Sequence, residues 1–188
     1  MKFNIGCGGN SFPGWINVDM VEQPGVDIVM NIDRDKWDLN LYENKATEIV
    51  MSHVLEHLHN PLFAMEQLWH IAAPGCLLTL KLPYGSSDTA WEDPTHVRPY
   101  FIGSFQYFSP SPYLINDYGY RGDWATKRII LDIETDRCDS NEGQAILEEL
   151  KVKRNLVREM TVEMVAMKPR RELKMGDKTE YELAFAFV

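Results

Sequence analysis

Residues Lys2 to Asp19, which read KFNIGCGGNSFPGWINVD, decide the fold. A short β-favouring run, Lys2–Ile5, enters a glycine-rich turn, and a second apolar run, Ile16–Val18, ends on an acid. Glycines after a strand let backbone N–H groups approach a ligand closely, and an acid that closes the next strand accepts hydrogen bonds from two ribose hydroxyls. This pairing favours a site for a nucleoside-containing cofactor, although similar glycine turns also occur with no ligand.

Length and composition indicate one globular domain over residues 1–188. Of the 188 residues, 45% are apolar and 11% aromatic, enough for one sizeable core. The formal net charge of −9 disfavours a nucleic-acid partner. Cys7, Cys76 and Cys138 fit neither a disulfide framework nor a CxxC zinc site, which favours a reducing, cytoplasmic setting. Neither a membrane-spanning run nor a signal-like start is visible, so we expect no membrane association.

The N-terminal half predicts short strands joined by loops. The connections after Ile5 and Asp19 are short and interrupted by proline and glycine, so loops are expected in place of the usual crossover helices. Composition and apolar patterning predict three further strands, of which the last is buried on both faces of the sheet. These three strands are Val26–Met30, Glu48–Met51 and Cys76–Pro83.

One amphipathic helix is predicted between the fourth and fifth strands. Asn60-Pro61 is a helix-start signal, with Asn60 as the cap and proline at the first position. Apolar residues then recur at helical spacing, which predicts a face packed on the sheet. Pro74-Gly75 is expected to end this helix.

The rest of the chain predicts an insertion followed by a C-terminal α/β segment. Residues 84–122 are rich in aromatics, prolines and glycines without a sustained period, and we expect an ordered insertion on the substrate side. Lys127–Glu134 predicts a strand and Glu142–Met160 a helix. Thr161–Met167 and Tyr181–Val188 are predicted to be strands that pair with each other in antiparallel fashion.

Taken together, five stretches resemble a known family. They are NIGCG with PGWINVD, then VDIVMNID, SHVLEHLHNP, APGCLLTLKLP and DPTHVR, and they occur in this order over residues 1 to 108. The sequence resembles small class I S-adenosylmethionine-dependent methyltransferases of the type-11 kind. The resemblance implies an α/β, Rossmann-like sheet, mostly parallel with an antiparallel last strand, here with reduced helices after the first strands. It also implies S-adenosylmethionine as the cofactor, bound across the C-terminal edge of the sheet.

The resemblance further implies which residues hold the cofactor. By position, these are Gly6 and Gly8 at the methionine moiety, Asp19 at the ribose hydroxyls, Asn31, Ile32 and Asp33 around the adenine, and Ser52 and His53 facing the sulfonium. Two positions depart from the family pattern, because Asn4 and Asn31 are amides where many relatives carry acids. An amide still donates and accepts hydrogen bonds.

Candidate catalytic residues lie in DPTHVR and after the fourth strand. Asp93 would orient the imidazole of His96 and raise its basicity, while Arg98 would hold an anionic group of the substrate. The alternative is that Asp93-Pro94 starts a turn and these charges brace the insertion. His53 is a further catalytic candidate at the site. Trp91 and Tyr107 would belong to an aromatic wall for a ring or sugar substrate.

No metal site is expected from the sequence. His53 and His57 lie four residues apart with Glu56 between them, a spacing that shares one face of a helix. The segment lacks the HExxH order and a third ligand at a recognisable spacing.

The resemblance implies a methyltransferase, which we expect to act on oxygen or nitrogen of a small-molecule or saccharide-like acceptor. One alternative is a methyltransferase-like binding or scaffold protein without turnover. Another is a nicotinamide-dependent reductase, disfavoured because no helix follows the glycine turn to receive a pyrophosphate. The reduced helices leave part of one sheet face uncovered, so a homodimer is expected.

Overall fold

In the described residues, eight strands form a single sheet. The computed structural model describes residues 1–110, 118–140, 142–174, 177 and 180–188. The strands are β1 (Lys2–Ile5), β2 (Ile16–Asp19), β3 (Ile28–Val29), β4 (Ala46–Ser52), β5 (Ala72–Pro83), β6 (Trp124–Ile133), β7 (Val157–Ala166) and β8 (Glu182–Phe187). The helices are α1 (Leu39–Tyr42), α2 (Pro61–Ile71), α3 (Thr89–Glu92) and α4 (Gly143–Glu149), with 3-10 helices η1 (Leu55–His57) and η2 (Ile102–Phe108).

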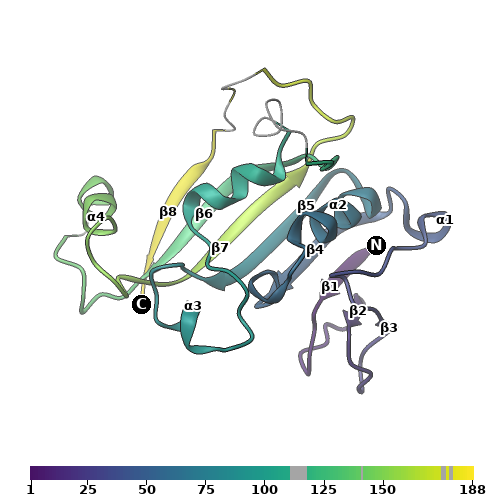
Figure 1. The fold of residues 1–188 in the computed structure, drawn as a ribbon, viewed down its shortest axis with the longest axis horizontal. Helices are drawn as coiled ribbons and strands as arrows, with labels where there is room; N and C mark the ends of the chain where they lie inside the picture. The colour runs from purple at the N-terminus through teal and green to yellow at the C-terminus, as the bar shows by residue number, and fades with distance from the viewer. Residues whose placement is uncertain (111–117, 141, 175–176, 178–179) are drawn as a thin grey trace.

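The strand directions confirm the predicted Rossmann-like sheet. The strand order is β3-β2-β1-β4-β5-β7-β6-β8, with β3 at one edge and β8 at the other (Figure 1). Among the described strands, β7 alone runs against its neighbours, pairing antiparallel with both β5 and β6, while the other pairs are parallel. The carboxyl ends of β1, β2 and β4 therefore meet at one edge of the sheet, where ligands bind in open α/β folds.

The first crossovers are loops, as predicted. The residues between Ile5 and Ile16, and between Asp19 and Ile28, are all described and contain no helix. Main-chain hydrogen bonds hold the second loop against β2, because the amide of Asp27 donates to the Asn17 carbonyl. Parallel pairing here is reached in extended conformation, which leaves the glycine turn open beside the sheet edge.

Helix α2 packs its apolar side into the core. Met65, Leu68 and Ile71 are fully buried, and the Trp124 indole donates a 2.9 Å hydrogen bond to the Met65 carbonyl. The helix ends at Ile71, three residues before the expected Pro74-Gly75 stop. Ala72 already pairs with Ala46 of β4, so sheet pairing ends the helix first.

The start of α2 is capped differently from the prediction. Asn60 stands at the cap position, but its side chain makes no capping hydrogen bond with the described residues. Instead, the Asp33 carboxylate accepts from the backbone amides of His59 and Asn60, at 3.1 Å and 2.7 Å. Asp33, in the loop after β3, thus accepts hydrogen bonds at the start of α2 in place of the Asn60 side chain, and this contact holds the loop against the helix.

The two faces of the sheet are covered unequally. Along β5, β6 and β7, fully buried side chains largely alternate with partly exposed ones. One face therefore carries the core, and the other retains contact with solvent. None of the described helices is long and apolar enough to cross a lipid bilayer.

The helix predicted over Glu142–Met160 is wrong in its second half. Helix α4 covers only Gly143–Glu149, and Val157 already belongs to β7. Asn155, just before the strand, has a left-handed φ of 57°. Val157 and Met160 are buried in the sheet, because pairing with β5 and β6 outweighs local helical spacing there, whereas Ile146 is buried as part of α4.

The predicted pairing of the last two strands is also wrong. Strand β7 lies between β5 and β6, so both of its edges are occupied. Strand β8 instead pairs with the free edge of β6, in parallel. The connection between β7 and β8 is long enough to reach this edge, which the local turn signals did not reveal.

The insertion over 84–122 is ordered where it is described. It contributes α3 and η2, and it buries the aromatic side chains of Tyr100, Phe105 and Phe108. Residues 111–117 of this predicted insertion lie outside the described residues. These three buried aromatic side chains therefore belong to the core and not to a substrate wall. Trp91 and Tyr107 lie on the surface, where they are 61% and 52% exposed.

Candidate functional site

A cavity opens at the carboxyl ends of β1, β2 and β4. Its volume is about 410 Å³. Apolar side chains and the ends of three parallel strands form its wall, with carboxylates and imidazoles at the rim. The lining residues are Gly6, Val18, Asp19, Met20, Met30, Asn31, Ile32, Asp33, His53, Val54, His57, Leu58 and His59.

Most of the predicted cofactor residues lie at this cavity. Six line it directly, namely Gly6, Asp19, Asn31, Ile32, Asp33 and His53. Gly8 and Ser52 are not part of the lining formed by the described residues, although Gly8 contacts Asp19. The sequence reasoning missed the apolar walls from Met20, Met30 and Leu58. Met20 and Met30 could have been predicted as lining residues, because they directly follow β2 and β3.

The glycine turn is shaped by a close approach to Val54. Gly6 has a φ of 65°, and a Cβ at this position would overlap the Val54 side chain. The amides of Gly6 and Cys7 both donate to the Val18 carbonyl, at 2.7 Å and 3.1 Å. The turn therefore requires glycine for both its backbone conformation and its packing.

Asp19 links the two halves of the opening motif. Its carboxylate accepts hydrogen bonds from the amide of Gly8 at 2.8 Å and from the amide of Val21 at 2.9 Å. The side chain is only partly buried and lines the cavity. It is thus held in place at the rim while it still faces a prospective ligand.

A buried pair of asparagines supports the turn from below. Asn4 and Asn17 are 4% and 5% exposed, and the Asn4 amide donates to the Asn17 side-chain carbonyl at 3.1 Å. Asn4 also donates to the Asn10 carbonyl, and Asn17 accepts from the Phe12 amide at 2.8 Å. A carboxylate at position 4 could not donate these bonds, which gives a physical reason for the amide there. The role of Asn17 was not anticipated.

In the loop after β3, the side chain of Asp33 binds the start of α2 rather than facing only the cavity. The carboxylate of Asp33 accepts from the amides that start α2, and its own amide donates to the Asn31 side chain at 3.0 Å. Asn31, Ile32 and Asp33 therefore form a fixed turn at the cavity, with Ile32 only 8% exposed.

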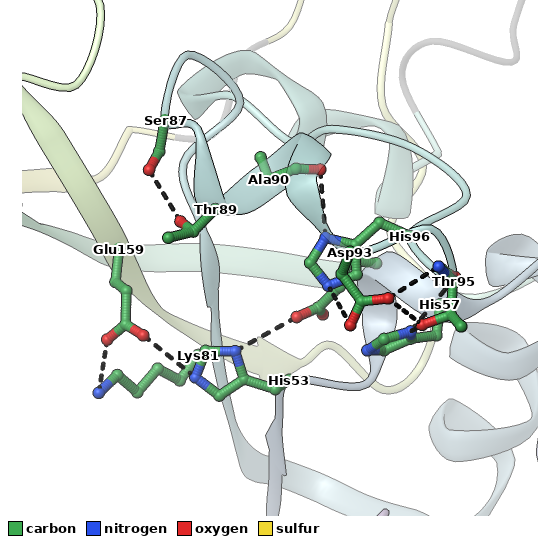
Figure 2. A network of polar contacts seen from close by, with 11 residues as sticks. His53, His57, Lys81, Ser87, Thr89, Ala90, Asp93, Thr95, His96 and Glu159 are labelled. Atoms are coloured by element: carbon green, nitrogen blue, oxygen red, sulfur yellow. Dashed lines mark hydrogen bonds and ion pairs between the residues drawn. The ribbon is translucent and has the colours of Figure 1, made fainter.

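His53 is held between two carboxylates. It follows β4 with a left-handed φ of 53°. Its Nδ1 lies 3.3 Å from Glu56 and its Nε2 lies 3.2 Å from Glu159, which also pairs with Lys81 at 2.7 Å (Figure 2). The contact with Glu56 raises the pKa of His53. Burial opposes this rise, and the charges of Glu56 and Glu159 add to it.

The predicted Asp93–His96 pair is adjacent but not tightly bonded. Asp93 Oδ2 lies 3.9 Å from His96 Nε2, whereas the other oxygen of Asp93 accepts from the hydroxyl of Thr95 at 2.6 Å (Figure 2). Hydrogen bonds from Thr95 lower the pKa of Asp93. His96 Nδ1 lies 3.1 Å from the Ala90 carbonyl. Asp93 thus shapes the DPTHVR turn more than it orients the imidazole.

The predicted substrate residues do not line the cavity themselves, although Arg98 contacts the lining residue His59. Trp91 donates its indole N–H to the Gly85 carbonyl at 2.9 Å, and Arg98 donates to the His59 carbonyl at 3.1 Å. Neither residue, nor Tyr107, is part of the cavity lining formed by the described residues. Arg98 instead helps to join the insertion to the β4–α2 connection.

Several contacts join these two segments. The Val97 amide donates to the Glu56 carbonyl at 2.8 Å, and the Tyr100 hydroxyl donates to the Leu55 carbonyl at 3.4 Å. The result is that the ring of His96 packs edge-on against the ring of His57, with centroids 4.7 Å apart. Because about 40 positions separate these two histidines, their contact could not be read from spacing.

Comparison with solved structures shows that the chain has the fold of SAM-dependent methyltransferases. No family model matches the sequence, and no curated protein matches it significantly. A SAM-dependent methyltransferase from Archaeoglobus fulgidus matches with a TM-score of 0.57 and 17% identity, over 87% of this chain and 85% of that one. A counterpart from Mesorhizobium loti matches with a TM-score of 0.52 and 12% identity, over 87% and 89%.

The same fold also supports other chemistry. The cyclase SpnF matches with a TM-score of 0.51 and 10% identity, over 88% of this chain and 75% of that chain. At such identities the likeness shows the fold alone, so the reaction must be argued from the site.

Proposed function

We propose that the chain is an S-adenosylmethionine-dependent methyltransferase whose cofactor occupies the cavity at the ends of β1, β2 and β4. The observation that carries this proposal is Asp19, a carboxylate fixed at the rim by Gly8 and facing a 410 Å³ cavity. Ribose hydroxyls are natural donors to such a carboxylate. Met20, Met30 and Ile32 supply apolar surface of the kind that an adenine ring contacts.

The other cofactor contacts follow from the same placement. Gly6 and Gly8 would approach the methionine moiety, and Asn31, Ile32 and Asp33 would flank the adenine. Ser52 and His53, at the carboxyl end of β4, would face the sulfonium. The glycine turn has no helix behind it, which suits the amino-acid end of this cofactor better than a pyrophosphate.

The proposed reaction is a direct displacement at the methyl carbon. A lone pair of the acceptor oxygen or nitrogen forms a bond to the methyl group as the carbon–sulfur bond breaks. The electron pair of that bond stays on sulfur, which yields S-adenosylhomocysteine, and the acceptor proton passes to a base or to water. The protein must mainly align the acceptor and exclude water.

His53, Asp93 and His96 are our candidates for proton handling. His53 lines the cavity, and His96 lies beside it in the insertion, with Asp93 as its neighbour. Trp91, Arg98 and Tyr107 are surface groups of the same insertion that would contact a larger, saccharide-like acceptor outside the cavity. This placement favours a small-molecule or saccharide-like substrate whose reactive hydroxyl or amine reaches inward.

The test is methyl transfer itself. The protein would be incubated with S-adenosylmethionine labelled in the methyl group and with fractionated small-molecule and saccharide extracts. We expect label in an acceptor and equimolar S-adenosylhomocysteine, both reduced in a His53→Ala variant and retained in a His70→Ala variant. Cofactor binding without label transfer to any fraction would favour the scaffold alternative. Stabilisation by a nicotinamide dinucleotide but not by S-adenosylmethionine would favour a reductase.

We also propose a cytoplasmic homodimer that does not bind nucleic acid. The cysteines Cys7, Cys76 and Cys138 are free, and the net charge is −9. The less covered sheet face includes partly exposed apolar side chains such as Leu77 and Val165. Light scattering should give twice the monomer mass, and a monomeric mass at working concentration would contradict this assembly.

A further inference from the structure

A second cluster of ligand-type side chains lies beside the cofactor cavity. Glu56, His57 and His96 each offer one ligand atom, and these atoms all lie within 4.8 Å of one another. Glu56 and His57 belong to η1, whereas His96 comes from the insertion. His57 lines the cavity as well, so the cluster and the cavity share a wall.

Glu56 is a buried carboxylate with one ion-pair partner, His53, and with no hydrogen-bond donor among the described residues. The residue is 3% exposed, and neither carboxylate oxygen accepts a hydrogen bond from the described residues. His53 Nδ1 approaches one oxygen at 3.3 Å without the alignment of a hydrogen bond. A buried charge is costly unless a cation compensates it, and His53 compensates it only while its ring is protonated. A bound cation would compensate the carboxylate when His53 is neutral as well.

The two histidines are prepared for metal binding through one ring nitrogen. His96 Nδ1 lies 3.1 Å from the Ala90 carbonyl, which can only accept, so Nδ1 carries the proton. His57 Nδ1 lies 3.3 Å from the Thr95 carbonyl and 3.0 Å from the Thr95 hydroxyl. In the neutral tautomer that results, the lone pair of each ring is on Nε2.

The same contacts form the outer layer that metal sites require. The hydroxyl of Thr95 donates to Asp93 at 2.6 Å, so its oxygen accepts from His57 and a chain runs from His57 through Thr95 to Asp93 (Figure 2). Metal-binding histidines almost always donate their second nitrogen to a carbonyl, a carboxylate or an equivalent group, which fixes the ring and increases its basicity. Both histidines here meet that condition.

We propose that Glu56, His57 and His96 bind a divalent transition-metal ion of the zinc type. Two imidazoles and one carboxylate are a common donor set for catalytic zinc, with a further position open to an exogenous oxygen. The proposed acceptor is then a hydroxyl compound, because a bound ion lowers the pKa of a coordinated hydroxyl. With His96 as a ligand of the ion, His53 is the remaining imidazole for proton handling. That last role rests on the proposed methyl transfer, whereas the ion site itself does not.

The test uses cobalt(II) as a spectroscopic probe of the purified, chelator-treated protein. We expect a visible d–d absorption that saturates at one cobalt per chain and is displaced by zinc. Glu56→Gln, which keeps the side-chain shape, and His96→Ala should each weaken cobalt binding by about tenfold or more. His70→Ala, a histidine at the end of α2 away from the cluster, is the matched control and should bind as the wild type does.

Titration of S-adenosylmethionine into the same samples separates the two proposals. Cofactor binding without a cobalt signal would overturn the metal site and leave the methyltransferase proposal intact. A cobalt signal without cofactor binding would do the reverse. Cobalt bands that persist unchanged in Glu56→Gln and His96→Ala would show that the ion binds elsewhere. Melting curves of each variant show whether it is folded, and Glu56→Gln remains informative if His96→Ala is not.

Discussion

The amide of Gly8 donates a 2.8 Å hydrogen bond to the carboxylate of Asp19, so the acid that ends β2 also holds the turn that follows β1. One side chain thereby sets the shape of the turn and the chemistry of the cavity rim. A substitution at Asp19 would therefore change both the turn and the rim. It must be compared with a substitution that disturbs β2 alone.

Replacing Asp19 by alanine should weaken S-adenosylmethionine binding by about tenfold or more, because hydrogen bonds to a charged group contribute roughly 1.5–3 kcal/mol each. Calorimetric titration measures the change. The matched control is Asp27→Ala, since the Asp27 carboxylate accepts from the Asn17 amide at 2.8 Å but is not a lining residue. Equal affinity in both variants would mean that Asp19 serves only the turn.

Gly6→Ala should destabilise the protein by two separable effects. The left-handed φ of 65° costs an alanine about 1–2 kcal/mol, and overlap with Val54 adds to this. Urea unfolding of Gly6→Ala, Val54→Ala and the double variant forms a cycle. The double variant should regain only the part of the unfolding free energy that Gly6→Ala loses through overlap with Val54. Additive effects of the two substitutions would contradict the close approach.

The segment after β7 is anchored by a buried ion pair. Asp123 is fully buried, and Arg171 contacts it through Nη2 at 2.6 Å and through Nε at 3.0 Å. Arg171→Met should reduce the free energy of unfolding by about 3–5 kcal/mol, because it leaves a buried carboxylate without its cation. Denaturant melts measure this loss.

The control for this pair is the combination of Arg171→Met with Asp123→Asn. Removing both charges should cost less than removing arginine alone, since the buried group is then neutral. A loss below about 1 kcal/mol in Arg171→Met would show that the pair contributes no more than a surface salt bridge.

The burial of Cys76 predicts its reactivity. Burial raises the pKa of the Cys76 thiol to about 12, so the thiol remains protonated through pH 9. Alkylation with iodoacetamide at pH 8 should label Cys138, which is partly exposed, before Cys76. Mass spectrometry of the peptides gives the order, and faster labelling of Cys76 would contradict the burial.

Much of the fold could be predicted because the parallel strands carry local signals. The opening motif predicted β1, β2 and the loop between them, and Asn60-Pro61 predicted the start of α2. Strand pairing at long range was not predictable in this way. Thr161–Met167 was predicted as a strand, but Val157 to Met160, at the start of β7, also suit helical spacing, and only the edges offered by β5 and β6 decide between the two.

The site residues also differ in how far the sequence could predict them. Asp19, which ends β2, and His53, which follows β4, were predicted from the opening motif and the family resemblance, and both line the cavity because the carboxyl ends of parallel strands meet at one edge. The contact of His57 with His96 and the burial of Glu56 depend on how the insertion folds back. No spacing in the sequence encodes that fold-back, so this cluster was missed.

The central claim is that the cavity behind Asp19 binds S-adenosylmethionine. Titration calorimetry of the wild-type protein with S-adenosylhomocysteine, which cannot be turned over, measures this most directly. We predict saturable binding with one ligand per chain. A folded protein that gives no binding with either S-adenosylhomocysteine or S-adenosylmethionine would contradict the account.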